Sequence, residues 1–504
     1  FTLCAVRLKE LGFDMLNVYA SYNASILAKS LSPIFNQRTD EYGGSLENRA
    51  RLLMELLTSV KQACGKDFPI ELQLSGYENI PGGYTQEDFV RYCKLFDEAE
   101  LVDIIQIRAW SGDMTHASSY NCKKDYPTNL HFAELLKQEQ LHALVAPVGG
   151  FQDPDLIERF LAEGRTDLVA MGRAFICDPD YGKKLYEGRG EDVIACLRCD
   201  KCHSGICAVN PAIGIQPSLL NQDTPAQSAS KKVAVIGGGP AGLKAAAECA
   251  ALGHSVTLYE KESYLGGQAH HADFMPDKWC MMDYKNSLIH ACQKNGVQLL
   301  TGTEATPQMI LDGNYDAVIA ACGSEPKTGP VPGSTLPHVW KPFPVFGHEK
   351  ELGEHIVVIG GAMIAVDTAL YLCHTGHKVT LVTRNREVAY DNTSHSHFQF
   401  GEALEQEPNL TMIPRAQTLN ITPQAVTVEI TSGGAPDFAP PGMPGPKEPP
   451  MPETKELRDI PCDNVVFSAG RRPLVEECMA FAGLTPKFFI VGDANMLSGD
   501  PVQR

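Results

Sequence analysis

The sequence has no apolar run long enough to cross a membrane, and it has few basic residues for a nucleic-acid surface. A membrane-spanning helix needs about 18 or more consecutive apolar residues, and no such stretch occurs. Lysine and arginine number 43 against 61 aspartate and glutamate, and the formal net charge of −18 argues against a nucleic-acid partner. We also expect no secretory signal, and most cysteines stand singly in apolar segments. We therefore expect a cytoplasmic protein whose thiols stay reduced.

With 504 residues the chain is long enough for about two to four domains. Residues 1–185 alternate short β-type runs with amphipathic helical patterns, which predicts a parallel sheet covered by helices. The strand candidates are 15–20, 70–75, 103–109, 144–149 and 168–173. Because a (β/α)₈ barrel has eight such strands, the pattern predicts an α/β fold that holds only part of a barrel.

The last two of these strands end in glycines that suit a phosphate group. Gly149 and Gly150 follow one strand, and Gly172 and Arg173 follow the next. Backbone N–H groups can approach a phosphate closely at glycine, and an arginine adds positive charge. Tight turns without a ligand use the same residues, so both interpretations stay open at this point.

A longer motif resembles a known family. Residues 32–57, SPIFNQRTDEYGGSLENRARLLMELL, resemble a segment shared by old yellow enzyme-type NADH:flavin oxidoreductases. The likeness is to the multidomain branch with 2,4-dienoyl-CoA reductase, 2-enoate reductase and trimethylamine dehydrogenase, whose FMN-phosphate loops are similar to PVGGF and LVAMGRAFICDP. The resemblance implies an FMN-binding TIM barrel of which the sequence holds strands four to eight. It also implies a fragment of a longer gene product, shortened at both ends.

The barrel segment departs from that family at two places. Tyr19 and Tyr22 stand where the family has a His-x-x-His or His-x-x-Asn pair. A phenol can donate a hydrogen bond or a proton, so the resemblance implies that these tyrosines position or protonate the substrate, with packing in the barrel as the alternative. Gln73 stands where the family places an arginine beside the flavin, and an amide stabilises an anionic reduced flavin more weakly. His116, in the loop after strand 103–109, is a third catalytic candidate on the same face.

A glycine-rich fingerprint opens the second half of the chain. In KVAVIGGGPAGLKAAAECAALGHSVTLYEKESYLGGQ, Gly237, Gly239 and Gly242 lie between a β-type run and a helix, and a second strand ends in Glu260. The first glycine permits a tight turn, the second lets a pyrophosphate approach, and the third lets the helix pack on the strand. A carboxylate at the second strand's end suits ribose hydroxyls. These residues predict a Rossmann-like dinucleotide-binding domain.

Two further segments, YDAVIAACGSEP and FFIVGDANM, resemble parts of two-dinucleotide-binding flavoproteins. The resemblance implies FAD bound by residues 231–345 together with 465–504. It places Gln268 in the site and Asp493 on the ribityl chain. The CxxxxC pair of a disulfide reductase does not follow LGGQ, so a disulfide substrate is not expected.

A second, altered fingerprint is nested inside the first domain. Residues 352–464 repeat the strand–turn–helix–strand pattern, with Gly360 and Ala362 at the first two fingerprint positions. At the end of the second strand Thr383 replaces the carboxylate, and Arg384 follows it. A guanidinium without a carboxylate accommodates a 2′-phosphate more easily, which favours NADPH over NADH. Alanine at the second position crowds the pyrophosphate, so a domain with weak or no nucleotide binding is the alternative.

Four cysteines, Cys196, Cys199, Cys202 and Cys207, lie close together between the two halves. Thiolates gathered in this way are metal ligands, and a C-x₂-C-x₂-C opening is typical of iron–sulfur ligation. A single zinc and the CxxCH pattern of a c-type haem are the alternatives, although zinc sites more often use two separated CxxC pairs. The resemblance implies a 4Fe–4S cluster within residues 186–225, but the family has longer intervals between its cysteines.

Taken together, the resemblance implies a flow of electrons from NAD(P)H to FAD, to the 4Fe–4S cluster, to FMN and to a small unsaturated substrate. The expected reaction is reduction of an activated C=C bond of the enoate, dienoyl or enone type. Hydride chemistry needs flavins, and a one-electron cluster can link two of them. Amine demethylation, as in trimethylamine dehydrogenase, and an electron-transfer module with a barrel that does not catalyse are the alternatives. A homo-oligomer is compatible with each of these schemes.

Overall fold

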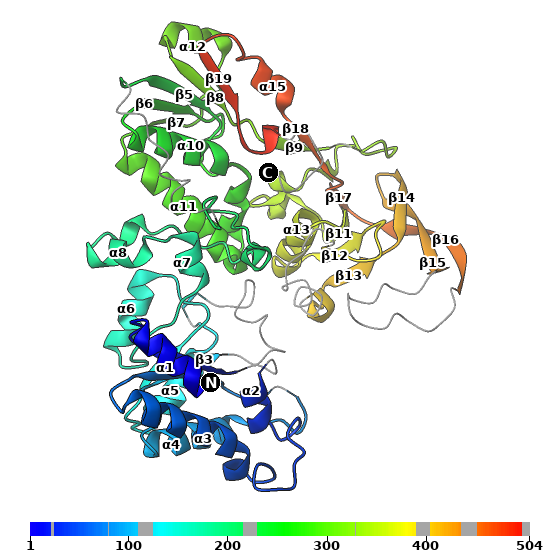
Figure 1. The fold of residues 1–504 in the computed structure, drawn as a ribbon. Helices are drawn as coiled ribbons and strands as arrows, with labels where there is room; N and C mark the ends of the chain where they lie inside the picture. The colour runs from blue at the N-terminus through cyan, green and yellow to red at the C-terminus, as the bar shows by residue number, and fades with distance from the viewer. Residues whose placement is uncertain are drawn as a thin grey trace. The chain divides into compact units, whose positions relative to one another are not determined.

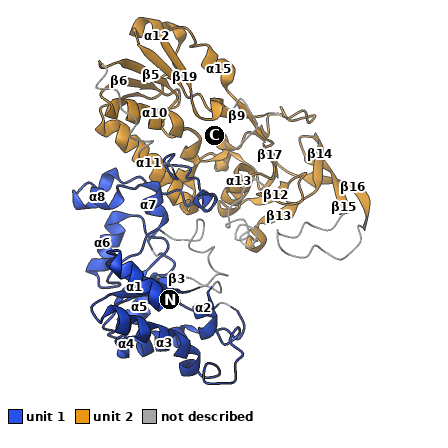
Figure 2. Ribbon diagram, viewed as in Figure 1, with its two compact units in different colours: residues 1–220 blue, residues 221–504 orange. Residues whose placement is uncertain are grey.

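The computed structural model describes residues 1–21, 25–78, 80–108, 124–125, 127–214, 229–327, 329–389, 404–434 and 451–495. The chain divides into two compact units, residues 1–220 and 221–504 (Figure 1; Figure 2). Each unit has its own hydrophobic core. No helix in the described ranges is long and apolar enough to cross a membrane.

Unit 1 contains a parallel sheet of four strands that follow one another in chain order. The strands are β1 (Leu16–Ala20), β2 (Ile70–Ser75), β3 (Ile104–Arg108) and β4 (Leu144–Pro147). The fifth predicted strand is described as a parallel bridge between Val148 and Ala170. The helices around this sheet are α1 (Thr2–Glu10), α2 (Ile26–Leu31), α3 (Leu46–Cys64), α4 (Gln86–Glu98), α5 (Leu130–Lys137) and α6 (Pro154–Ala162). This succession of strands and helices is the one expected for part of a (β/α)₈ barrel.

Local sequence explains why α3 begins where it does. The side chain of Ser45 accepts a hydrogen bond from the Asn48 backbone N–H, which caps the helix. Gly44 precedes the cap with a φ of +82°, a value that favours glycine. The buried apolar face consists of Leu46, Ala50, Leu53, Leu57, Val60 and Cys64. That face packs on the strands, so the helical spacing of these residues forms one side of the core.

Unit 1 ends in short elements that carry the cysteine loop. These are α7 (Arg173–Cys177), α8 (Tyr181–Tyr186), η2 (Gly190–Asp192) and η3 (Lys201–Ser204). Cys196 and Cys199 precede η3, Cys202 lies in it, and Cys207 follows it.

Unit 2 contains two parallel five-stranded sheets, one inserted within the chain of the other. The first has the order β19–β8–β5–β6–β7. Its strands are β5 (Lys232–Ile236), β6 (Ser255–Tyr259), β7 (Gln298–Leu300), β8 (Ala317–Ala320) and β19 (Lys487–Ile490). Its helices and turns include α10 (Pro240–Ala251), η4 (Gly267–Phe274), η5 (Pro276–Lys278), α11 (Trp279–Lys294), α12 (Pro307–Gly313), α15 (Val475–Met479) and η8 (Gly492–Asn495). Since β19 returns after the inserted segment, the nesting predicted from the two fingerprints is confirmed.

The inserted sheet has the order β10–β17–β11–β12–β13. Its strands are β10 (Val339–Trp340), β11 (His355–Ile359), β12 (Lys378–Val382), β13 (Leu410–Ile413) and β17 (Asn464–Phe467), with α13 (Met363–His374) after β11. An antiparallel sheet adds β14 (Ala416–Ile421), β15 (Ala425–Gly434) and β16 (Met451–Pro461). A two-stranded ribbon pairs β9 (Ser324–Pro326) with β18 (Arg471–Pro473). This ribbon lies where the chain leaves the first sheet and returns to it.

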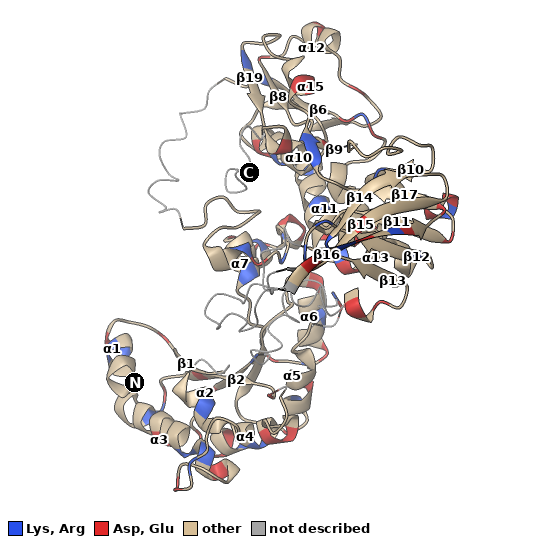
Figure 3. Ribbon diagram, turned by 90° about the vertical axis from the view of Figure 1, so that its right-hand side faces the viewer, with Lys and Arg blue, Asp and Glu red and all other residues tan. Residues whose placement is uncertain are grey.

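Charged residues of both signs are interspersed over each unit in the view of Figure 3. On the helices of unit 1, Arg91 lies 3.0 Å from Glu47, and Lys94 lies 2.9 Å from Glu139. Exposed pairs of this kind contribute about 0–1 kcal/mol each, so they affect solubility more than stability.

Candidate functional site

A row of hydrogen-bonded polar side chains crosses β1, β2 and β3. Ser21 Oγ donates to Gln73 Oε1 at 2.9 Å, and Gln73 Nε2 donates to Gln106 Oε1. Gln106 Nε2 in turn donates to Glu71 Oε1 at 2.8 Å, and Asn17 Nδ2 donates to Glu71 Oε2 at 2.6 Å. Successive residues of a strand point to opposite faces, so this polar row lies opposite the apolar face that forms the core. The Gln73 amide is therefore held in place by its neighbours.

Tyr19 lies in the same part of the sheet, paired in register with Gln73. Residues paired in a parallel ladder point to the same face, so the predicted catalytic phenol and the predicted flavin-contacting amide share one face. The sequence analysis did not predict Ser21 as a site residue. It follows Tyr19 by two residues, and side chains two apart along a strand point to the same face, so the spacing could have identified it. Tyr22 and His116 lie outside the described residues, and their catalytic roles stay predictions.

The two predicted phosphate turns differ in their backbone. Gly149 and Gly150 have φ values of +112° and +97°, which side chains rarely adopt, so this turn requires glycine. Gly172 has a φ of −114° and is the residue before α7. A Cβ at Gly172 would meet no heavy atom within 4 Å, which leaves room at this turn for a ligand.

Arg173, the first residue of α7, forms an ion pair with Asp200 of the cysteine loop. The Asp200 side chain is 2% exposed and that of Arg173 is 24% exposed. A second arginine of the loop, Arg198, donates from Nε to Gln152 Oε1 at 3.1 Å. Both Arg198 and Asp200 have positive φ values, +52° and +56°. The loop is therefore fastened at two points to the segments that carry the predicted phosphate turns.

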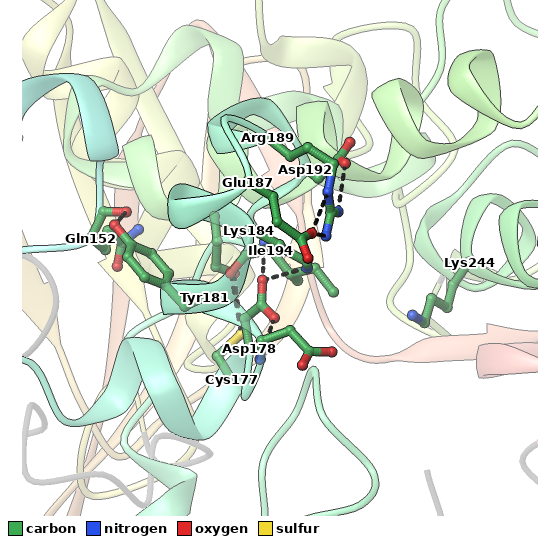
Figure 4. Close-up of polar contacts among 12 residues, drawn as sticks. Gln152, Cys177, Asp178, Tyr181, Lys184, Glu187, Arg189, Asp192, Ile194 and Lys244 are labelled. Carbon is green, nitrogen blue, oxygen red and sulfur yellow. Dashed lines mark hydrogen bonds and ion pairs between the residues drawn. The ribbon is translucent and has the colours of Figure 1, made fainter.

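Asp178 holds the segment of the chain directly before Cys196, the first cysteine of the loop (Figure 4). Its Oδ2 accepts the Ile194 backbone N–H at 2.9 Å and the Lys184 ammonium at 2.7 Å. Cys177 Sγ lies 3.7 Å from the carbonyl oxygen of Ile194 and 3.6 Å from that of Ala195. These contacts hold the chain directly before Cys196 against α7.

The four predicted ligands lie near one another on this loop. Cys199 interacts electrostatically with Cys196 and Cys207, and Cys202 interacts with Cys196 and Cys199. Backbone N–H groups donate to two of the sulfurs: Arg198 N to Cys196 Sγ and Asn210 N to Cys207 Sγ, each at 3.4 Å. Each of the four cysteines is half-buried. N–H donors to sulfur are among the features that adjust the potential of iron–sulfur clusters.

No group of three or more His, Cys, Asp or Glu side chains in the described ranges is placed to hold a metal ion. The iron–sulfur cluster and its zinc alternative therefore both stay predictions from the four cysteines.

Two of the three glycines in the first fingerprint lie where segments of the backbone approach each other closely. A Cβ on Gly237 would lie 2.4 Å from the Ala321 oxygen, and one on Gly242 would lie 1.9 Å from the Gly237 oxygen. These two glycines are therefore needed for the fold itself. At Gly239 the nearest atom to such a Cβ is Gly267 Cα at 4.0 Å, so this position has room without a ligand. Packing therefore does not explain why Gly239 is a glycine, and the close approach of a dinucleotide does.

Glu260 lies at the end of β6, as the fingerprint requires. Its Oε2 accepts the Gly238 backbone N–H at 2.6 Å, and its Oε1 accepts the Glu262 N–H at 2.8 Å. The carboxylate therefore stabilises the glycine-rich turn, and it lies at the strand end where such a residue accepts hydrogen bonds from ribose hydroxyls.

Gln268 and Asp493, predicted from distant segments, are brought together through Ser324. Gln268 Nε2 donates to the Ser324 carbonyl oxygen, and Ser324 Oγ donates to Asp493 Oδ2 at 3.0 Å. Arg471 Nη2 lies 3.0 Å from the same Asp493 oxygen. Ser324 and Arg471 come from the ribbon β9–β18, and the sequence reasoning missed both because neither belongs to a motif.

The second fingerprint has a similar glycine turn after β11, but the residue after β12 is Thr383 where the first domain has Glu260 after β6. Gly360 has a φ of +148°, and a Cβ there would lie 2.3 Å from the Ser468 oxygen. Ala362 is the residue before α13. Thr383 is 3% exposed, and its hydroxyl accepts the Asn385 backbone N–H at 3.2 Å. Arg384 beside it is exposed, so a guanidinium is available at the strand end where the first domain has Glu260.

A buried ion pair connects α13 to the segment after Gln268. Asp367 Oδ1 lies 2.8 Å from Lys278 Nζ, with both side chains under one tenth exposed. His271 Nε2 lies 3.7 Å from Asp367 Oδ2, and His271 Nδ1 lies 2.5 Å from the Gln268 carbonyl oxygen. Burial disfavours the charge of Asp367, but the charges and hydrogen bonds of Lys278 and His271 outweigh it and lower its pKa. The helix of the second fingerprint is thus tied to the turns that follow the first.

Comparison with known proteins agrees with this arrangement. Residues 1–192 match the NADH:flavin oxidoreductase / NADH oxidase family, and residues 231–501 match the pyridine nucleotide-disulphide oxidoreductase family. The chain belongs to the multidomain branch of the old yellow enzyme-type NADH:flavin oxidoreductases. The resemblance carried by residues 32–57 is confirmed, and so is the expectation of flavin cofactors.

Similar proteins in this branch are longer than the chain. It is 33% identical over 411 residues to an NADH oxidase of Thermoanaerobacter brockii, covering 79% of this chain and 62% of that protein. It is 31% identical over 407 residues to a cinnamate reductase of Clostridium sporogenes, covering 75% of this chain and 59% of that protein. A solved 2-naphthoyl-CoA reductase in complex with 2-naphthoyl-CoA is similar with a TM-score of 0.87 and 26% identity, covering 99% of this chain and 73% of that one. The chain thus spans less than two thirds of the two curated relatives.

Proposed function

We propose that the chain is part of an NAD(P)H-dependent reductase of activated C=C bonds that binds FMN, FAD and a 4Fe–4S cluster. The observation that carries the proposal is the attachment of the four-cysteine loop to the barrel's predicted phosphate turn through Arg173 and Asp200. Such an attachment keeps a redox centre beside a flavin site, which an electron-transfer enzyme needs. Relatives named cinnamate reductase and 2-naphthoyl-CoA reductase support a C=C substrate.

In this proposal the chain's residues hold the cofactors as follows. The FMN phosphate lies against Gly149, Gly150 and Gly172, with Arg173 supplying charge. FAD lies on the first fingerprint with Asp493 at its ribityl chain. When bound, the flavins supply hydride chemistry and the cluster supplies one-electron transfer between them, so that electrons pass from NAD(P)H through FAD, cluster and FMN to the substrate.

The cluster ligands in the proposal are Cys196, Cys199, Cys202 and Cys207. Backbone N–H groups directed at two of these sulfurs stabilise thiolate charge, which supports ligation by thiolates. Arg198 and Asp200, which lie between the first three cysteines, have positive φ values, and turns at these residues are proposed to let the closely spaced thiols reach one cluster.

At the substrate, Tyr19 is proposed to donate a hydrogen bond to the carbonyl group conjugated to the C=C bond. Its place opposite Gln73 in the β1–β2 ladder supports this role, because a polarised carbonyl makes the β-carbon of the conjugated C=C bond a better hydride acceptor. The substrate class is an enoate, an enone or a dienoyl thioester.

The proposal is tested on the protein at its natural length, purified without oxygen. We expect FMN, FAD, about four iron and about four sulfide ions per chain, and NAD(P)H oxidation that matches the loss of the C=C bond of cinnamate or an enoyl thioester. Oxidation of trimethylamine without any C=C reduction contradicts the proposal. FAD and iron without FMN also contradict it and favour an electron-transfer module.

Matched variants locate the cluster. Cys199→Ala is expected to lose iron and sulfide, whereas Cys249→Ala, which removes a half-buried thiol of α10, is expected to keep both. Equal iron content in the two variants, or one zinc per chain in place of iron, would exclude the cluster.

A further inference from the structure

Two side chains of the ribbon β9–β18, Ser324 and Arg471, meet at the carboxylate of Asp493. Ser324 is the first residue of β9, and Arg471 is the first residue of β18. Ser324 Oγ donates to Asp493 Oδ2 at 3.0 Å, and Arg471 Nη2 lies 3.0 Å from the same oxygen. Arg471 Nη2 also donates to Ser324 Oγ. The guanidinium, the hydroxyl and the carboxylate therefore form a closed triangle of polar contacts.

Both contacts use the same oxygen of the carboxylate. Oδ2 receives Ser324 and Arg471, whereas Oδ1 accepts no hydrogen bond from any residue in the described part of the chain. The Asp493 side chain is 42% exposed, so Oδ1 can be reached from outside the protein. An ionised carboxylate accepts hydrogen bonds on both oxygens. A carboxylate held by Oδ2 alone therefore keeps Oδ1 for a hydroxyl group of a ligand.

Asp493 lies beside the first fingerprint. Gly492, which precedes it, has a φ of +70°, and a Cβ there would lie 2.7 Å from Ala241 Cβ. Ala241 stands between Gly239 and Gly242, in the first turn of α10. The turn that carries Asp493 is thus packed on the turn proposed to hold the FAD pyrophosphate. Because the ribityl chain of FAD is joined directly to the pyrophosphate, its hydroxyls are the ligand groups expected next to this turn.

Ser324 also holds the other predicted FAD residue, Gln268. Gln268 Nε2 donates to the Ser324 carbonyl oxygen, and a Cβ on the neighbouring Gly267 would lie 2.9 Å from Gly239 Cα. Ser324 is 6% exposed, so water competes little for these hydrogen bonds. One buried serine therefore connects Gln268 and Asp493 on either side of the fingerprint.

We propose that Arg471 and Ser324 are positioning residues for FAD, which hold Asp493 by Oδ2 and leave Oδ1 to accept a hydrogen bond from a ribityl hydroxyl. This inference rests on the proposed binding of FAD to the first fingerprint. A ligand binds more tightly when the protein group that it contacts is already ordered. The contact of Arg471 is charge-assisted, and such hydrogen bonds are stronger than neutral ones. Arg471 therefore contributes more to this order than Ser324 does.

The next residue of the ribbon offers a matched control. Arg472 Nη2 donates to Glu325 Oε1 at 2.9 Å and to Glu477 Oε1 at 2.7 Å. Its side chain is 42% exposed, and exposed pairs of this kind contribute little to stability. Arg472→Gln removes the same charge from the same strand as Arg471→Gln, but it leaves the contacts of Asp493 in place.

The test measures FAD binding by equilibrium dialysis of the full-length protein, with the FMN of the barrel as the internal reference for protein that is folded. Arg471→Gln is expected to raise the Kd for FAD at least about tenfold, and Ser324→Ala at least about threefold. Arg472→Gln should stay within about twofold of the unsubstituted protein. Arg471→Lys keeps the charge and one donor atom, so it is expected to recover part of the affinity.

A double variant shows whether Arg471 acts through Asp493. Asp493→Asn alone should weaken FAD, and adding Arg471→Gln should weaken it by less than about a further twofold, because the arginine then has no carboxylate to hold. If Arg471→Gln does not fold, Ser324→Ala paired with Asp493→Asn makes the same comparison. Losses that multiply in the double variant, or equal FAD affinity in Arg471→Gln and Arg472→Gln, overturn the inference.

The inference and the proposed function can fail separately. Unsubstituted protein that binds no FAD contradicts both. Normal FAD binding with the expected losses in Arg471→Gln and Ser324→Ala, but without reduction of any C=C bond, contradicts the proposed reaction and supports the role of the two positioning residues.

Discussion

Arg173 and Asp200 form an ion pair that joins the first residue of α7 to the middle of the cysteine loop. One residue of the pair comes from the predicted phosphate turn and the other from the predicted cluster loop. Because Asp200 is buried and in a left-handed conformation, its side chain is directed at the arginine by a backbone that allows few alternatives. The position of the loop therefore depends on this contact together with the hydrogen bond from Arg198 to Gln152.

Asp200→Ala is expected to loosen the loop without unfolding unit 1. Removing the buried Asp200 carboxylate deletes its ion pair with the partly exposed Arg173, which costs about 1–3 kcal/mol, so amide exchange in residues 194–207 should rise roughly 5- to 160-fold. Hydrogen exchange with mass spectrometry measures this change, with α3 as the internal reference. Glu187→Ala, which removes an exposed partner of Arg189, is the control and should leave the loop unchanged. Equal exchange rates in the loop of Asp200→Ala and unsubstituted protein contradict the prediction.

Asp367→Asn is expected to reduce the stability of unit 2. Removing one partner of a buried ion pair costs about 3–5 kcal/mol, whereas Lys244→Met, at an exposed pair with Glu248, should change the free energy of unfolding by less than about 0.5 kcal/mol. Urea unfolding followed by tryptophan fluorescence compares the two variants. A loss in Asp367→Asn no greater than that in Lys244→Met would show that the pair is not a stabilising contact.

The same carboxylate predicts an acid dependence. Because folding lowers the pKa of Asp367, its contribution is complete above the ordinary pKa of aspartate and is lost as the pH falls through the lower folded value. Unfolding free energy measured down a pH series should therefore decline less steeply in Asp367→Asn than in the unsubstituted protein. Parallel curves for the two proteins contradict this assignment.

The three glycines of the first fingerprint are expected to separate folding from FAD binding. Gly242→Ala places a Cβ against the Gly237 oxygen, and overpacking of this kind costs about 1–3 kcal/mol. Gly239→Ala meets no such atom and should change the stability of the FAD-free protein by less than about 1 kcal/mol. It should nevertheless weaken FAD at least about tenfold, because the pyrophosphate must approach this backbone. FAD titration and urea unfolding on both variants make the comparison, and retention of full FAD affinity in Gly239→Ala contradicts the prediction.

The sequence predicted what is encoded locally. The glycine turns, the cap at Ser45 and the strand ends could be read because contiguous residues determine their backbone. The strand predicted at 168–173 is described as a bridge at Ala170, since strand length depends on the neighbouring strand as well as on composition. The parallel pairing of the strands in unit 1 followed from the repeated βα pattern, which favours parallel neighbours.

Contacts between distant segments could not be predicted in this way. Asp200 lies 27 residues after Arg173, and no periodicity relates the two. The contact of Asp367 with Lys278 requires the inserted sheet to pack on the turns after Gln268, which is a result of tertiary folding. The sequence around such a pair does not identify it, because a charged residue that will form a buried ion pair cannot be told from one that stays on the surface.

The end of β12 is expected to determine the choice between NADPH and NADH. Arg384→Ala should raise the KM for NADPH at least about tenfold, equivalent to about 1.4 kcal/mol, while the KM for NADH stays within about twofold. Thr383→Glu restores the carboxylate found at Glu260 and should favour NADH, because its oxygens can accept ribose hydroxyls and repel a 2′-phosphate. Ferricyanide reduction by each nucleotide measures both constants, and Arg458→Ala, at an exposed arginine of β16, is the control. Equal increases in both KM values for Arg384→Ala contradict the prediction. They would mean that the guanidinium contributes to the affinity for both nucleotides and does not recognise the 2′-phosphate.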